Sequence, residues 1–243
     1  MLWLAGPCSL ALSVFDGVFD TRALKSLAPA AAASGLGHTL YSRREPPRTI
    51  LEAAVDSFLR EMSDDSPYVE YWSRQEWKHI EAHADVDEAL AAAGGTLRYP
   101  RHAHVLYLEV GSKVRGATCV WQPRESEACG SDERFGAMTA VPAVAGRVLR
   151  FAGDLQHAVP RPADVWFSSF VINQRSTPPE DYIRSVLLFN TWPDPGSPPK
   201  DVQPIPAETA IRFSVHDAGD VLCRERRLWK EAQTAVRHVE PYP

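Results

Sequence analysis

The chain has 243 residues, of which 44% are apolar and 23% are charged, and its formal net charge at pH 7 is -5. This composition is that of a folded protein with an apolar core, and it excludes a disordered or fibrous chain. The acidic balance disfavours a protein that neutralises nucleic-acid phosphates, because that requires clustered Lys and Arg. A β-rich chain of this length can form one domain, and we expect a single domain over residues 1–243.

The cysteines and the amino-terminal segment bear on the compartment. Cys8, Cys119, Cys129 and Cys223 form no CxxC pair, so they predict neither a zinc ribbon nor a redox motif. We expect a reduced, intracellular and cytoplasmic setting. The opening MLWLAGPCSLALSVF is broken by Gly-Pro and is too short to span a bilayer. We interpret it as the lead into a first strand near residues 10–15, with a weak signal peptide or a truncated transit sequence as the alternative.

Two segments have the pattern of a helix. In TILEAAVDSFLREM, residues 49–62, Thr49 is followed three residues later by Glu52, and apolar residues recur at helical spacing. This predicts an amphipathic helix. The segment 221–240 reads as a second, charged helix. Its predicted inner face consists of Leu222, Leu228, Trp229, Ala232 and Val236.

After about residue 103 the character of the chain changes from helical to strand-like. Short runs rich in Val, Leu and aromatic residues are separated by Gly, Pro and polar clusters; the runs are HVLYLEV, ATCVW, RVLRF, DVWFSSFV and RSVLLFN. Such a series is typical of a β-sandwich or barrel. The sequence therefore predicts a mainly β fold with helices in front of the barrel.

The stretch HIEAHADVDEALAAAGG, residues 79–95, has three competing interpretations. It can be an alanine-rich helix that stops at Gly94-Gly95. It can present His79 and His83 as a helical zinc pair, although the zinc-protease pattern needs Glu directly after the first His and Ile80 stands there. It can instead be extended, which places His83 and Asp85 on the same side of the chain, where both can bind one ion.

Downstream residues favour the extended interpretation. GRVLRFAGDLQHAVPRP supplies His157 at the end of a strand and a tight turn. Two histidines and one carboxylate form a facial triad that leaves open positions on Fe(II). Further on, RSVLLFN carries Arg184 at the head of an apolar strand. A buried arginine needs an anion, and its planar guanidinium suits a carboxylate.

In type and order these segments resemble the Fe(II)/2-oxoglutarate-dependent dioxygenases, over about residues 72–195. The resemblance implies a double-stranded β-helix core of the jelly-roll or cupin-like kind, with a helical part at about residues 20–80, a core at about 81–195 and an extension at 196–243. It also implies that Fe(II) is bound by three residues that match the family pattern: His83, Asp85 and His157.

The same resemblance implies that 2-oxoglutarate is the cosubstrate and that Arg184 binds its distal carboxylate. The gap between His157 and Arg184 is longer than in many members, so Arg175 is the fallback. Tyr107 and Thr118 lie on neighbouring predicted strands and are candidates for a hydrogen bond to the cosubstrate, with packing inside the barrel as the alternative. The implied reaction is hydroxylation with release of succinate and CO2. The substrate is not identified; a small molecule or a protein side chain is expected, and nucleic acid is not.

A rival grouping resembles the first cupin metal motif and implies a cupin-like metal-binding or scaffold protein. Its ligands would be His102, His104, Glu109 and His157. Strict strand alternation in HAHVLYLEV places Glu109 on the face opposite both His102 and His104, so this site would need a bulge. The cupin grouping also leaves Arg184 without a role. We therefore prefer the oxygenase-like site, and both groupings predict the same barrel.

Overall fold

The computed structural model describes residues 12–33, 37–76, 79–114, 116–122, 136–160, 180–193, 198–199, 201–212, 214, 221–231 and 237–239. Its strands are β1 (Leu12–Asp16), β2 (Thr39–Ser42), β3 (Tyr68–Glu76), β4 (Ile80–His83), β5 (His102–Val110), β6 (Ala117–Trp121), β7 (Met138–Pro142), β8 (Val148–Ala152), β9 (His157–Val159), β10 (Ile183–Trp192), β11 (Gln203–Pro204), β12 (Lys230–Glu231) and β13 (Arg237–Val239). Its α-helices are α1 (Thr21–Ala33), α2 (Ile50–Glu61), α3 (Glu88–Ala92) and α6 (Ala207–Arg212). Among the residues described, no helix is long and apolar enough to cross a membrane.

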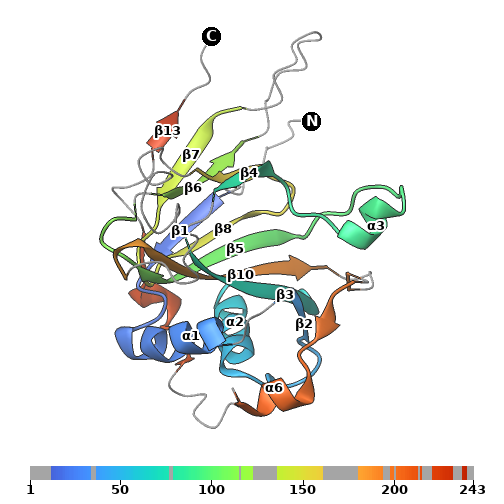
Figure 1. The fold of residues 1–243 in the computed structure, drawn as a ribbon, viewed down its shortest axis with the longest axis horizontal. Helices are drawn as coiled ribbons and strands as arrows, with labels where there is room; N and C mark the ends of the chain where they lie inside the picture. Colours follow the sequence, from blue (N-terminus) through green and yellow to red (C-terminus); the bar gives the residue numbers. More distant parts are fainter. Residues whose placement is uncertain are drawn as a thin grey trace, which may run out of the picture.

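The strands form two sheets that lie face to face (Figure 1). The large sheet has the order β11-β2-β3-β10-β5-β8-β1-β12, and the small sheet has the order β13-β7-β6-β9-β4. The chain crosses repeatedly from one sheet to the other. Strands β3, β10, β5 and β8 are neighbours at the centre of the large sheet, and β7, β6, β9 and β4 are neighbours in the small sheet. All pairs among these eight strands are antiparallel. This is the topology of a double-stranded β-helix, and the predicted mainly β fold is confirmed.

Apolar side chains fill the space between the sheets. Val105, Phe151 and Val186 of the large sheet pack with Val120 and Val141 of the small sheet. All five side chains are nearly inaccessible to water. Burying each such side chain stabilises the fold by about 1.5–3 kcal/mol.

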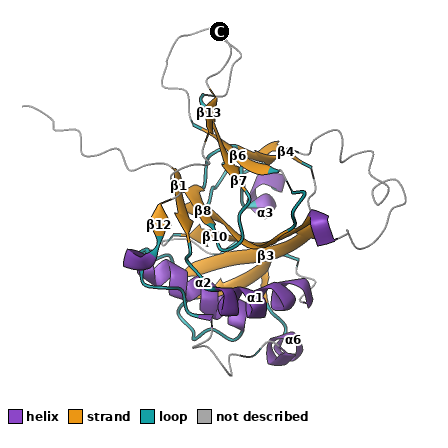
Figure 2. Cartoon of the chain, turned by 90° about the vertical axis from the view of Figure 1, so that its left-hand side faces the viewer, coloured by secondary structure: helices purple, strands orange, loops and turns teal. Residues whose placement is uncertain are grey.

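Helices α1 and α2 cover the outer face of the large sheet (Figure 2). The predicted helix at residues 49–62 is confirmed as α2. The Thr49 hydroxyl accepts a hydrogen bond from the Glu52 amide at 3.1 Å, as the capping pattern requires. In a complete capping box the Glu52 carboxylate would accept a hydrogen bond from the Thr49 amide. Here it accepts instead from the Arg48 amide and from the Tyr71 hydroxyl. It thereby ties the start of α2 to β3.

The interpretation of residues 79–95 as one helix is wrong for its first half. Residues 80–83 form strand β4, which pairs with β9, and only Glu88–Ala92 are helical. The Asp87 carboxylate caps this short helix by accepting from the Leu90 amide. Gly94, with φ of 71°, follows its end, as predicted. Pairing with β9 supplies backbone hydrogen bonds that outweigh the helix propensity of the alanines.

The charged helix predicted for residues 221–240 is also wrong over the residues that the structure describes, 221–231 and 237–239. A 3-10 turn at Arg226–Leu228 is followed by β12, which pairs with β1 and is the edge strand of the large sheet. Leu222 and Leu228, both assigned to the inner face, are each 56% exposed. Trp229 does pack inward, with its ring centroid 5.2 Å from that of Phe15. Pairing with β1 supplies ladder hydrogen bonds that the helical pattern does not reveal.

Some predicted features lie outside the described residues. These are the strand DVWFSSFV, the fallback Arg175, the cysteines Cys8 and Cys129, and the helix positions Ala232 and Val236. Strands also occur on both sides of the expected core at residues 81–195. Strands β2 and β3 precede it and β11 follows it, and all three belong to the large sheet. The large sheet thus combines segments from most of the described chain.

A buried carboxylate on the outer face of the large sheet should contribute strongly to stability. The Asp64 side chain is 0% exposed, and it accepts hydrogen bonds from His102 and from the Ser66 amide. Burial opposes its ionisation, but these hydrogen bonds outweigh burial and hold the pKa of Asp64 well below its usual range. Its stabilising effect is therefore present above the unfolded pKa, near 4, and is lost as the pH falls towards the lower folded pKa.

We expect Asp64→Asn to lower the free energy of unfolding by about 3 kcal/mol at pH 7, because it leaves the partly buried guanidinium of Arg150 without its anion. Urea denaturation at pH 7 and at pH 3 measures the effect, which should be smaller at pH 3. The matched control is Asp65→Asn, since Asp65 carries the same charge at the neighbouring position and its side chain is 86% exposed. Its effect should stay within about 0.5 kcal/mol. Equal losses in the two variants would contradict this role of Asp64.

Candidate functional site

A pocket of about 400 Å³ opens at one side of the barrel. Its lining comes from β3, β4, β9 and β10, from the segment that follows β4, and from residues near 200. It contains the predicted iron ligands His83, Asp85 and His157, and it also contains Arg184 and Thr118. The structure therefore brings five of the six predicted site residues to one cavity. Tyr107 lies behind it with its side chain fully buried.

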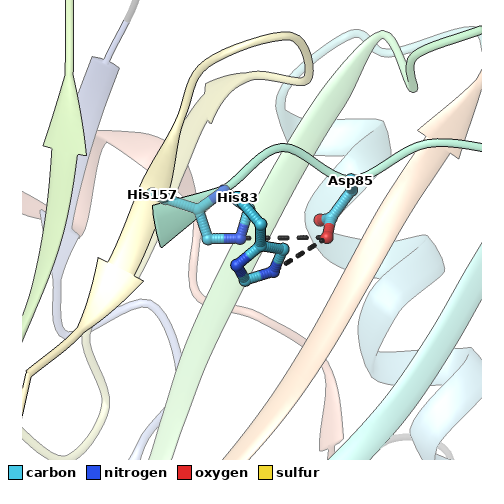
Figure 3. Close-up of side chains that lie close together, drawn as sticks. All are labelled: His83, Asp85 and His157. Carbon is cyan, nitrogen blue, oxygen red and sulfur yellow. Dashed lines mark ion pairs between the residues drawn. The ribbon is translucent and has the colours of Figure 1, made fainter. Parts of the chain in front are cut away.

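Strand pairing places the two histidines side by side. His83 ends β4 and His157 begins β9, and the two residues are direct partners in the antiparallel ladder. Asp85 follows His83 by two residues, and its side chain points back toward both imidazoles (Figure 3). Its Oδ1 lies 3.6 Å from His83 Nε2 and 3.8 Å from His157 Nε2. The three ligand atoms lie within 4.8 Å of one another, which is a spacing that one metal ion can bridge.

The hydrogen bonds of the two histidines assign the same tautomer to both. His83 Nδ1 lies 2.8 Å from the Glu81 carbonyl oxygen, and His157 Nδ1 lies 3.2 Å from the Leu155 carbonyl oxygen. A carbonyl oxygen only accepts, so each Nδ1 carries the hydrogen and donates it. Both Nε2 atoms then keep a free lone pair on the side of Asp85. This is the tautomer that a histidine uses to bind a metal through Nε2.

Asn190, from β10, orients the carboxylate. Its amide nitrogen donates to Asp85 Oδ2 at 3.1 Å, which leaves Oδ1 facing the histidines. The Asn190 side chain is almost completely buried. This residue was not among the predicted site residues, although a polar side chain in the apolar run VLLFN was a signal of the same kind as Arg184.

The charges of the trio fit a cation. Burial opposes ionisation of Asp85, but the nearby His83, the charge of His157 and the hydrogen bond from Asn190 outweigh burial and hold the pKa of Asp85 below its usual range. Burial lowers the pKa of His157, whereas the nearby carboxylate of Asp85 raises the pKa of His83. An ionised carboxylate next to neutral imidazoles is the state that a divalent transition metal requires.

Arg184 provides an anion site in the same pocket. Its side chain is 2% exposed, and its guanidinium donates to the Thr118 hydroxyl at 3.1 Å. The Tyr107 hydroxyl shares a 2.7 Å hydrogen bond with the same Thr118 oxygen, and the guanidinium carbon lies 5.2 Å from the centre of the Tyr107 ring. Within the part of the chain that the structure describes, no carboxylate pairs with Arg184 and its Nε has no hydrogen-bond partner. A buried cation in this state calls for an anionic ligand.

The cupin-type grouping is contradicted by the structure. His104 lies on the outer face of the large sheet, where its ring stacks on Phe189 with centroids 4.3 Å apart and its Nδ1 donates to the Phe189 carbonyl oxygen. His102 contacts Asp64 on the same side, and Glu109 is exposed. Among the described residues, only His83, Asp85 and His157 form a group that could bind a metal.

Strict alternation along β5 fails near its end. The register between β5 and β10 shifts between Ser185 and Val186, and Val110 packs in the core between the sheets together with Tyr107. Strict alternation would place these two residues on opposite faces. A bulge inserts one extra residue into a strand and reverses the faces beyond it. The bulge does not bring Glu109 to the histidines.

Comparisons with known proteins identify similar solved structures. No family model and no curated protein matches the chain. A prolyl-4-hydroxylase from Pseudomonas putida is 15% identical, with a TM-score of 0.47, over 77% of this chain and 88% of its own. HygX from Streptomyces hygroscopicus with iron bound is 17% identical, with a TM-score of 0.46, over 76% and 83%. The epimerase SnoN from nogalamycin biosynthesis is 12% identical, with a TM-score of 0.43, over 82% and 92%.

Removing the amide that orients Asp85 should weaken metal binding. We expect Asn190→Leu, which keeps the size of the side chain, to lower Fe(II) affinity by about 10–100-fold, because Asp85 Oδ2 loses its hydrogen bond. Anaerobic titration with a competing chelator measures the change. Thr191→Val is the matched control, since Thr191 is buried on the same strand and does not line the pocket. Equal affinity in the Asn190→Leu variant and the wild type would show that Asn190 does not position Asp85.

Proposed function

We propose that this protein is a non-haem Fe(II)- and 2-oxoglutarate-dependent oxygenase that hydroxylates a substrate and releases succinate and CO2. One observation carries the proposal: a His-Asp-His trio and a buried arginine without a carboxylate partner share one pocket of a double-stranded β-helix. Either feature by itself is compatible with several classes of protein. Together they match the two binding tasks of such an enzyme, a metal site and a dicarboxylate site.

In this proposal His83, Asp85 and His157 bind Fe(II) through two imidazole Nε2 atoms and one carboxylate oxygen. Three ligands on one side of the metal leave positions for a cosubstrate and for oxygen, which is the arrangement used by non-haem Fe(II) oxygenases. When bound, the iron supplies the oxidising chemistry, which amino-acid side chains cannot perform themselves. The chain contributes the placement of the ligands, and Asn190 holds the carboxylate in its orientation.

Arg184 would bind the distal carboxylate of 2-oxoglutarate, and Thr118 would help. The guanidinium can form two parallel hydrogen bonds with a carboxylate, which fixes the direction of the cosubstrate as well as its position. Thr118 lines the pocket and touches Arg184, so its hydroxyl can contact the same carboxylate. Tyr107 would act as a positioning residue, since it holds the Thr118 oxygen and packs against the guanidinium.

We further propose that residues 1–243 form one domain, that the protein works in the reducing cytoplasm and that its substrate is not a nucleic acid. The large sheet, which joins segments from residue 12 to residue 231, supports a single domain. Free thiols at Cys119 and Cys223 and a need for ferrous iron both suit a reducing compartment. The formal charge of -5 supports a substrate other than a polyanion.

Anaerobic titration of the protein with Fe(II) and then 2-oxoglutarate tests the proposal. We expect a visible charge-transfer band that needs both additions, and slow conversion of 2-oxoglutarate to succinate when oxygen is admitted. A panel of candidate substrates should then reveal a compound that accelerates succinate formation. If Fe(II) does not bind, or if 2-oxoglutarate produces no band and no succinate, the proposed function is wrong.

A further inference from the structure

A second arginine faces the same pocket and has no role in the proposed cosubstrate site. Arg74 lies on β3, directly across the ladder from Val186 of β10. Glu70, Trp72 and Arg74 alternate along β3, so all three side chains lie on the face that lines the pocket. The chemical environment of Arg74 therefore bears on what the pocket binds besides the cosubstrate.

Arg74 has no anionic partner of its own in the part of the chain that the structure describes. No carboxylate lies within ion-pair distance of its guanidinium, although Asp85 is near enough to act on its charge. Burial lowers the pKa of Arg74, and the positive charge of Arg184 lowers it further. Two guanidinium groups that repel each other in one cavity are costly unless anions enter it.

The carboxylates nearby do not meet this need. Glu70, on the same face of β3, is already engaged: its Oε1 lies 2.5 Å from His38 Nδ1 and its Oε2 accepts from Trp192 Nε1 at 3.2 Å. Glu88 and Asp201 also line the pocket, but neither forms an ion pair with Arg74. Asp85 belongs to the candidate metal site.

The charges of the loaded site leave Arg74 unbalanced. A ferrous ion and the Arg184 cation together carry as much positive charge as the Asp85 carboxylate and the 2-oxoglutarate dianion carry negative charge. The metal, its protein ligands and the cosubstrate with its arginine are therefore neutral as a unit. Arg74 remains as an uncompensated cation beside that unit, on the strand at its flank.

We propose that Arg74 binds a carboxylate or phosphate group of the substrate and so selects small organic anions for the oxidation. This inference rests on the proposed function and adds a substrate class to it. Trp72, two residues earlier on the same face, offers an apolar wall for the rest of the molecule, and its ring is held by stacking on His38 at 4.3 Å. A cavity of about 400 Å³ has the size of a small-molecule site.

Isothermal titration calorimetry on the protein loaded anaerobically with Fe(II) and saturating 2-oxoglutarate tests this. The probes are benzoate and phenyl phosphate, which present the two anion types on an apolar ring, and neutral benzamide. Since 2-oxoglutarate occupies Arg184, anion binding reports on Arg74. We expect at least one anion to bind more tightly than benzamide and Arg74→Gln to weaken it by ~10-fold or more. Arg74→Lys should retain part of the affinity, and Arg212→Gln, on the exposed helix α6, should change nothing.

The outcomes separate the inference from the proposed function. If the wild-type protein binds neither Fe(II) nor 2-oxoglutarate, both the proposed function and the inference about Arg74 are wrong. If metal and cosubstrate bind but neither anion does, or if Arg74→Gln binds the anions as well as the wild type, the inference alone is wrong. It is also wrong if Arg74→Gln lowers the affinity for 2-oxoglutarate as strongly as Arg184→Gln does, because Arg74 would then belong to the cosubstrate site.

Discussion

Replacement of Asp85 by alanine is expected to abolish Fe(II) binding and, with it, succinate formation. Asp85 is the anionic member of the trio, and its Oδ1 lies 3.6 Å from His83 Nε2 and 3.8 Å from His157 Nε2. Without it, two neutral nitrogen atoms remain to bind a dication in a partly buried pocket, next to the positive charges of Arg74 and Arg184. Loss of a direct ligand should exceed the ~10–100-fold effect of losing an outer partner, so we expect a loss of ~100-fold or more.

Metal content after anaerobic loading and desalting measures this effect, together with 2-oxoglutarate turnover. Glu109→Ala is the matched control, because it removes the same charge from β5 at an exposed position. It should retain full metal content. Loss of metal in the Glu109 variant but not in the Asp85 variant would favour the cupin-type site over the His-Asp-His site. Full metal content in both variants would show that the carboxylate of Asp85 is not a ligand.

Replacement of Arg184 by glutamine should leave metal binding intact and reduce the affinity for 2-oxoglutarate by ~100-fold or more, because a buried charge-assisted pair contributes several kcal/mol. The variant should have a second property. In the free protein Arg184 is a buried cation without a carboxylate partner among the described residues, so its removal should not lower the free energy of unfolding. We therefore expect Arg184→Gln to lose affinity for 2-oxoglutarate without losing stability.

Thermal unfolding of the metal-loaded protein, with and without 2-oxoglutarate, measures both properties. A ligand that binds only the folded state raises the melting temperature, so the wild type should shift upward with 2-oxoglutarate and Arg184→Gln should not. Arg184→Lys keeps the charge but cannot form a bidentate pair with a carboxylate, so 2-oxoglutarate should raise its melting temperature by an intermediate amount. An undiminished shift in Arg184→Gln would assign the distal carboxylate to another residue. Arg175, outside the described residues, would then be the next candidate.

The neutrality of the loaded site connects these predictions with the inference about Arg74. Asp85 and Arg184 are each matched by a charge on the metal or the cosubstrate, whereas Arg74 is not. Loss of Asp85 should therefore affect metal binding first, and loss of Arg184 should affect cosubstrate binding first. Loss of Arg74 should affect only the binding of a further anion. The three variants thus report on three separate binding events in one pocket.

Local sequence patterns were sufficient to predict an element when the residues that stabilise it lie within that element. The cap at Thr49 and the apolar spacing behind it predicted α2, since both act within the helix. Alternating and apolar runs predicted β5, β6, β8 and β10, because a half-buried strand displays its two faces in its sequence. His83, Asp85, His157 and Arg184 were expected as site residues because their types and their order along the chain resemble the pattern of the Fe(II)/2-oxoglutarate-dependent dioxygenases.

The remaining elements and the composition of the pocket depend on contacts between segments that are distant in the sequence. No single segment contains the information about these contacts. Residues 80–83 are extended because β9 pairs with them, although the alanines that follow favour a helix. After residue 221, Lys230–Glu231 pair with β1 and Arg237–Val239 pair with β7, so the described part of this segment forms strands in place of the predicted helix. Asn190 has a role only because β10 brings it to Asp85, more than a hundred residues earlier in the chain. The sequence by itself determined the elements of the barrel and the residue types of the site. The tertiary structure decided which strands pair, and therefore which of the polar side chains share the pocket.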